Sequence, residues 1–132
     1  MSILTDVDTA LYQRLTSTGG TALWNQRVYA HQAPQGTPSP YVIFFHVVGG
    51  DLNLSPSRLI DMRYQVEVWA ETLAEARQGA DYLETALHNA ALTVSGWNLI
   101  GCEQEDAISS VENDKGTQCF RRGSDYRIRM SK

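Results

Sequence analysis

The sequence lacks the short motifs that mark common enzyme and nucleotide-binding sites. It has no Walker A loop, no dinucleotide-binding G-x-G-x-x-G and no G-x-S-x-G nucleophile elbow. Its two cysteines, Cys102 and Cys119, are not spaced as C-x-x-C. Its histidines, His31, His46 and His88, have no second ligand at metal-binding spacing. These absences argue against an enzyme, and we expect no catalytic residues, no cofactor and no metal.

Positive charge is also scarce, with 11 Lys and Arg against 15 Asp and Glu and a net charge of −4. Affinity for nucleic acid backbones comes mostly from Lys and Arg displacing counterions. DNA near this protein is therefore expected to pass without specific binding. The arginines between 121 and 129 keep open a nucleic-acid-binding alternative, although they could equally pair with acids such as those of the 103–106 run.

Long apolar runs are missing as well. No stretch approaches the roughly 18 residues that a membrane-spanning helix needs. The first 15 residues lack the basic flank and apolar core of a signal peptide and instead show helical spacing. We expect no membrane partner.

The chain has 132 residues, 42% of them hydrophobic and 20% charged, which suits one globular domain over 1–132. Apolar residues recur at helical spacing near the N-terminus and predict a helix over 5–17, with a capping box from Thr5 to Asp8. A second capping box, from Thr72 to Glu75, opens a helix that ends near residue 89.

Five further segments have the β-branched, aromatic or alternating character of strands. They are 24–31, 41–48, 61–70, 97–111 and 118–130. A proline-rich passage separates the first two, a long loop over about 49–60 separates the next two, and a turn at 113–116 separates the last two. The predicted fold class is α+β: a mostly antiparallel β-sheet of four to five strands with two α-helices packed on one face.

The predicted turn also bears on the cysteines. A turn centred near 114–115 places about Ser110 opposite Cys119. Cys102 then lies about eight residues further along the same strand, ~26 Å from the position opposite Cys119. A disulfide needs Cα atoms within about 7 Å. We therefore expect two reduced thiols.

One face of this sheet lacks a predicted cover. In the strand 41–48, alternate residues from Tyr41 to Val47 are expected to face the helices, while Val42, Phe44 and Val48 point away, joined by Trp69. Large exposed apolar patches usually mark interaction sites. Either the 49–60 loop folds over this face or another subunit covers it.

The order of segments resembles the tail-completion and head-to-tail joining (tail terminator) proteins of long-tailed bacteriophages. The resemblance is carried by Arg27-Val28-Tyr29, by Ala33-Pro34-Gln35, by Pro40-Tyr41 leading into an apolar strand, and by Val66-Glu67-Val68-Trp69-Ala70 leading into an alanine-rich helix. It spans about residues 10–130.

That resemblance implies a structural virion protein of the tail or neck, assembled in the host cytoplasm. Such proteins form a ring, commonly a hexamer, that terminates the tail tube and joins it to neck and connector proteins. The family carries no catalytic residues. The alternatives are a non-virion chaperone for tail assembly or a small hydrolase or ligand-binding domain.

Closed rings are built by contacts between two different patches. We expect the 49–60 loop to supply one patch and the 113–116 turn the other. The candidate subunit and partner interface residues are Val42, Phe44, Val48, Leu52, Leu54, Arg58, Leu59, Trp69, Asp114 and Lys115.

Overall fold

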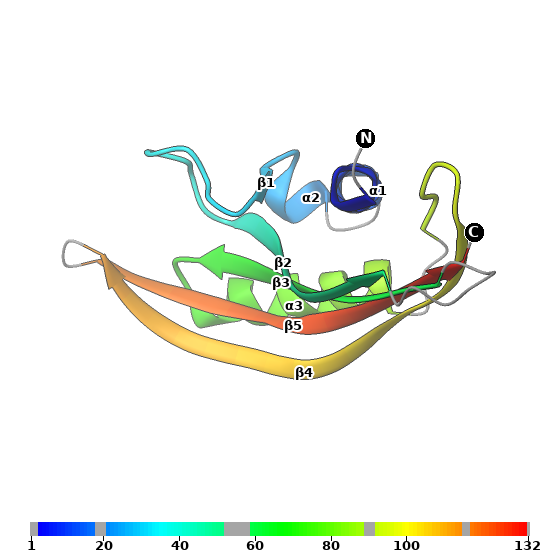
Figure 1. Ribbon diagram of the computed structural model, residues 1–132. Coiled ribbons are helices and arrows are strands. Elements are labelled where there is room, and N and C mark those ends of the chain that lie inside the picture. The colour runs from blue at the N-terminus through cyan, green and yellow to red at the C-terminus, as the bar shows by residue number, and fades with distance from the viewer. Residues whose placement is uncertain (1–2, 18–20, 52–58, 89–91, 115–116, 132) are drawn as a thin grey trace.

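The computed structural model (Figure 1) describes residues 3–17, 21–51, 59–88, 92–114 and 117–131. It contains three helices and five strands in these residues. In chain order they are α1 Ile3–Thr16, α2 Thr21–Trp24, β1 Val28–Ala30, β2 Tyr41–Asp51, β3 Leu59–Ala70, α3 Leu73–Leu87, β4 Asn98–Asp114 and β5 Thr117–Ser131.

The strands form one sheet in the order β1-β2-β3-β5-β4. All neighbouring pairs are antiparallel except β1 and β2, which run parallel. The helices α1 and α3 lie on the same face, which we call the helix face, so the predicted α+β class is confirmed. Among the described residues, no helix combines the length and apolar character that crossing a membrane requires.

Helix α3 begins as its sequence predicts. The Thr72 hydroxyl accepts a hydrogen bond from the Glu75 backbone N–H at 3.2 Å, and the same hydroxyl donates to Glu75 Oε1 at 3.1 Å. The helix then packs closely on β3 at Gly79, where an added Cβ would lie 2.7 Å from the Val68 side chain. Glycine at this position lets α3 approach the sheet.

Helix α1 is tied to the sheet and to α3 by polar contacts around an apolar core. The Tyr64 hydroxyl of β3 donates to Asp8 Oδ1 at 2.8 Å, and Arg14 Nε donates to the Ala86 carbonyl of α3 at 2.8 Å. Because α1 begins at Ile3, Thr5 lies inside the helix, and the predicted capping box there is wrong.

The first predicted strand is shorter than expected. Residues 21–24 form α2 instead, and Trp24 is fully buried, with its indole N–H donating to the Leu15 carbonyl at 3.0 Å. Asn25 and His31 both adopt positive φ angles, of 54° and 67°, which limit the strand to three residues. The passage from 32 to 40 then returns the chain so that β2 starts beside β1 in parallel.

The connection between β2 and β3 is also shorter than the predicted 49–60 loop. Strand β2 continues through Gly49 and Gly50 to Asp51, and β3 starts at Leu59. The ladder pairs Asp51 with Ile60. Residues 52–58 lie outside the described residues.

The hairpin β4–β5 turns later than expected, because Asp114 pairs with Thr117. Cys119 therefore lies opposite Glu112 rather than Ser110, and Cys102 lies opposite Ile128. Neither cysteine forms a disulfide, as predicted.

The predicted orientation of β2 is wrong. Val42 pairs with Val68 and Phe44 with Val66, so these side chains point toward the helices and are buried in the core. Strand β2 is apolar at nearly every position, so it carries no alternation that identifies its inner face. A bulge at Val47 then shifts the phase, so that Val48 pairs with Arg63 on the opposite face.

Candidate interface on the open face of the sheet

The face of the sheet opposite α1 and α3, which we call the open face, is lined mainly by charged and aromatic side chains. Strand β3 contributes alternate residues from Asp61 to Trp69, and the register of the ladder places its neighbours on the same side. They include Tyr41, Ile43, Phe45, Glu103, Ser110, Glu112, Arg121, Asp125, Arg127 and Arg129. The open face is therefore polar over most of its area and differs from the apolar surface that the sequence suggested.

Ion pairs neutralise the arginines of this face. Arg127 contacts both carboxylate oxygens of Asp61, at 2.9 and 2.5 Å. The hydrogen bond from Arg127 is the main cause that holds the pKa of the Asp61 carboxyl below its usual value. Arg127, a member of the late arginine cluster seen in the sequence, is thus paired with a carboxylate of the same chain.

Two more pairs extend this row. Arg129 bonds Glu103 at 2.8 Å, and Arg63 bonds Glu105 at 3.0 Å. All of these side chains are partly exposed, so each pair contributes only about 0.2–1 kcal/mol. Their main effect is that this part of the face presents arginines already matched by carboxylates.

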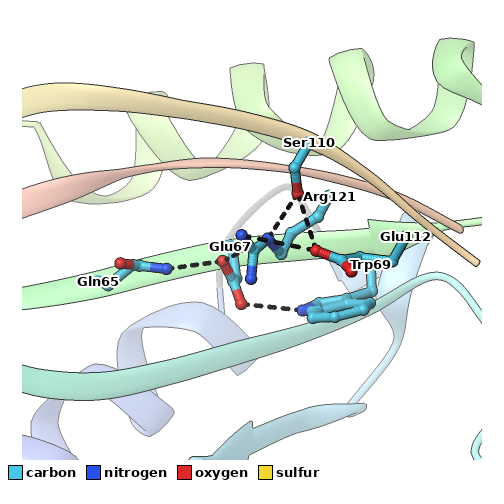
Figure 2. A network of polar contacts seen from close by, with 6 residues as sticks. All are labelled: Gln65, Glu67, Trp69, Ser110, Glu112 and Arg121. Atoms are coloured by element: carbon cyan, nitrogen blue, oxygen red, sulfur yellow. Dashed lines mark hydrogen bonds and ion pairs between the residues drawn. The ribbon is translucent and has the colours of Figure 1, made fainter.

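A buried carboxylate, Glu67, organises the other half of the open face (Figure 2). It is only 2% exposed. Gln65 Nε2 donates to Oε2 at 2.9 Å, the Trp69 indole N–H donates to Oε1 at 3.0 Å, and Arg121 Nε lies 3.4 Å from Oε2. Both carboxylate oxygens are therefore satisfied, as a buried charge requires.

Arg121 links this network to the edge strand β4. Its Nε donates to Ser110 Oγ at 3.0 Å, and its Nη2 lies 3.9 Å from Glu112 Oε1 (Figure 2). Its guanidinium also lies over the Trp69 ring, 5.5 Å from the centroid. The network joins β3, β5 and β4 through side chains far apart in sequence.

The aromatic row continues from Trp69 into a hollow. The rings of Trp69 and Tyr41 stack at 6.2 Å with an interplanar angle of 7°. Residues 31–37 form one side of a hollow of about 470 Å³, and Tyr41, Ile43, Glu67 and Trp69 form the other. Aromatic surface and the Glu67 carboxylate, which is already hydrogen-bonded within the chain, meet in this hollow.

A bulge in β4 gathers three carboxylates. Glu105 and Asp106 lie opposite the single residue Asp125, between the pairs Gln104–Tyr126 and Ala107–Ser124. One oxygen of Asp125 is buried without a hydrogen-bond partner. Burial, and then the charges of Asp106 and Glu105, raise the pKa of Asp125.

The end of the hairpin projects beyond the rest of the sheet. Strand β3 pairs with β5 only as far as Ala70 opposite Phe120, whereas β4 and β5 stay paired to Asp114 and Thr117 (Figure 1). We call residues 112–114 and 117–119 the arm. A two-stranded ribbon is marginal in water, and Val111 at the base of the arm is 54% exposed. The arm is therefore suited to contact another molecule.

The structure separates the predicted interface residues into groups. Val42 and Phe44 are buried in the core and are not available to a partner. Val48 is 56% exposed on the open face, and Trp69 and Leu59 are half-buried. Asp114 lies at the end of the arm. Leu52, Leu54, Arg58 and Lys115 lie outside the described residues.

Sequence reasoning missed the Glu67 network and the hollow. The one available signal is the acidic residue in an otherwise apolar passage, Val66-Glu67-Val68, because a charge at the centre of a sheet needs partners.

The groups that could carry chemistry have structural partners instead. His46 Nε2 lies 2.8 Å from the Gly49 carbonyl, and His88 Nδ1 accepts from the Gln104 backbone N–H at 3.1 Å. Burial raises the pKa of the Cys102 thiol to about 12, which leaves it unreactive. Within the described part of the chain, no three His, Cys, Asp or Glu side chains are placed to hold a metal ion.

Comparisons with known proteins give one family. The family model described as "Tail completion protein gp17" matches residues 9–131. A solved structure titled "Virion of native gene transfer agent (GTA) particle" contains a chain with the same fold, at a TM-score of 0.84 and 20% sequence identity. The match covers 99% of this chain and 98% of that one. No curated protein sequence matches significantly.

Proposed function

Because this chain belongs to the tail completion protein gp17 family and is a structural protein of the virion tail or neck, we propose that its copies close into a ring, with six copies expected. The ring sits at the head-proximal end of the tail tube. It stops tube polymerisation and presents a surface to the neck proteins. The family match over nearly the whole chain carries this proposal.

The shape of the sheet supports a ring. Its two edges differ, since β1 has three residues in a parallel pair and β4 has 17 residues in an antiparallel pair. A ring needs contacts between two unlike surfaces, whereas a symmetric dimer uses one surface twice. A chain with two unlike sheet edges provides the two unlike surfaces that a ring needs.

The charge of the chain supports passage of DNA through such a ring. The net charge is −4, and Arg63, Arg121, Arg127 and Arg129 are each held by a carboxylate of the same chain. Arginines that are already paired contribute little to phosphate binding, which depends on displacing counterions. DNA is proposed to move past this protein without adhering to it.

The two ends of the strands are proposed as contacts for the axial neighbours, the tail tube on one side and the neck on the other. Strand β2 ends at Asp51 and β3 starts at Leu59 at one end of the sheet, and the arm projects at the other (Figure 1). From sequence, the 49–60 loop and the 113–116 turn were expected to join ring subunits. Because the described ends of β2 and β3 and the arm lie at opposite ends of the strands, they are proposed to meet neighbours along the strand direction rather than across it.

Deletion of the gene for this chain from the particle that encodes it tests the proposal. Tube growth then has no stop, so electron microscopy is expected to show tubes of scattered and excessive length without attached heads. Supplying the chain in trans is expected to restore uniform, headed tails.

Headed tails of normal length in the deletion strain contradict the proposal. Mass spectrometry of proteins in purified complemented particles separates the remaining alternative. A structural ring protein is present in the finished particle, whereas an assembly chaperone is absent from it.

A further inference from the structure

The two outer strands of the sheet, β1 and β4, are complementary in direction. Along the order β1-β2-β3-β5-β4, one parallel step is followed by three antiparallel steps. Strand β1 therefore runs opposite to β4. In a ring whose axis follows the strands, rotation from one copy to the next preserves strand direction. Strand β4 of one copy then meets β1 of the next in the antiparallel sense, which is the more stable pairing.

The two edges also correspond through the register of the ladder. The ladder aligns Ala30 with Phe44, Phe44 with Val66, Val66 with Ser124 and Ser124 with Ala107. Following the paired residues across the same four strand pairs aligns Val28 with Ser109. Rotation about an axis along the strands leaves height unchanged. Residues 107–109 of one copy therefore reach the level of residues 28–30 of the next.

This stretch of β4 is the part without edge protection. Bulges interrupt the strand at Ile100 and at 105–106, and bulges of this kind prevent a second strand from pairing. From Ala107 to Val111 the ladder has no bulge, and the sequence has no proline and no charged residue; the acidic Glu112 and Asp114 follow. Natural proteins rarely leave a regular edge of this length without protection unless a strand pairs with it.

We propose that the joint between ring subunits is a continuation of the sheet, in which β4 of one copy, at Ala107–Ser109, pairs with β1 of the next copy, at Val28–Ala30. This rests on the proposed ring. The occupant of each edge is another copy of the same chain. The joint then pairs all three residues of β1 with the stretch Ala107–Ser109 of β4.

Disulfide cross-linking between copies tests this joint. Ala30 and Ala107 are small, exposed and in the same row, with their side chains on the helix face. Residues directly opposite across an antiparallel pair have Cβ atoms about 4.5–5.5 Å apart, close to disulfide geometry. Within one copy the two edges are four strand spacings apart, about 19 Å, so an intramolecular bond is excluded.

The variant carries Ala30→Cys, Ala107→Cys and Cys119→Ser. After mild oxidation, a denaturing gel without reductant is expected to show a ladder of covalent multimers up to the full ring, which collapses to monomer on reduction. A mixture of two proteins, each with one of the new cysteines, is expected to stop at covalent dimers, because each copy then has only half of a joint.

The matched control replaces Ala107→Cys with Val111→Cys, four residues or about 13 Å further along the same edge and face. It is expected to give no ladder. A ring seen by native mass spectrometry without cross-linking of the Ala30–Ala107 variant overturns the joint and leaves the ring intact. Absence of any oligomer at high concentration overturns the proposed ring, and the joint with it.

Discussion

Gly123→Ala is expected to unfold the domain or destabilise it by about 3 kcal/mol or more. Gly123 lies in β5 opposite Glu67, where the neighbouring strand comes unusually close. A Cβ added there would lie 2.0 Å from the Val66 carbonyl oxygen and 2.6 Å from the Glu67 Cα. These are backbone atoms of the central strand, so they cannot move aside without breaking the ladder. Urea unfolding followed by circular dichroism measures the loss.

Gly101→Ala is the matched control in the neighbouring strand. Its added Cβ would meet only the end of the Glu103 side chain, at 3.3 Å, and that side chain can move. We expect a change within about 0.5 kcal/mol, as for most surface substitutions. Equal stability of the two variants would show that β3 and β5 are not packed as described.

Arg121→Ala is expected to destabilise the domain by about 2 kcal/mol, because it leaves the Glu67 carboxylate buried without its cationic partner. This figure lies below the range for a fully buried pair, since the Arg121 side chain is 27% exposed. Adding Glu67→Gln to the same variant removes the unpaired charge and is expected to recover part of the loss. Unfolding free energies from urea titration measure both effects.

Arg129→Ala serves as the comparison for Arg121→Ala. Its partner Glu103 is 46% exposed, so solvent replaces the lost contact and the expected change is at most about 1 kcal/mol. Losses of equal size at the two arginines would mean that Glu67 does not depend on Arg121. A large loss only at Arg121 would assign the stabilisation to the buried network.

The helices, β3 and the hairpin were predictable because their sequences carry periodicity. In β3, alternate residues from Met62 to Ala70 face the core, as the pattern indicates. Strand β2 has no such alternation, so its inner face depends on pairing with β3. The bulge at Val47 is a second feature that only the paired strands reveal.

The candidate site was less predictable than the fold. Its central residues, Glu67, Ser110 and Arg121, come from three strands and meet only through the register of the ladder. The sequence shows an arginine cluster and an acidic run without showing that they pair. The parallel placement of β1, which makes the two sheet edges complementary, depends on positive φ angles at Asn25 and His31 that neither residue type requires.

We expect the chain to close into a ring through the two unlike edges of its sheet. Edges that match in strand direction and in register between copies favour one closed species. Every copy gains two joints only when the ring is complete. Open chains leave two unpaired ends. Assembly is therefore expected to be cooperative in protein concentration.

Native mass spectrometry of the unmodified chain over a range of concentrations tests this claim most directly. We expect monomer at low concentration and, above a threshold, one dominant species at six times the chain mass of 14.7 kDa, with few intermediates. A species that stops at two copies, or monomer alone at the highest concentration, would contradict the account.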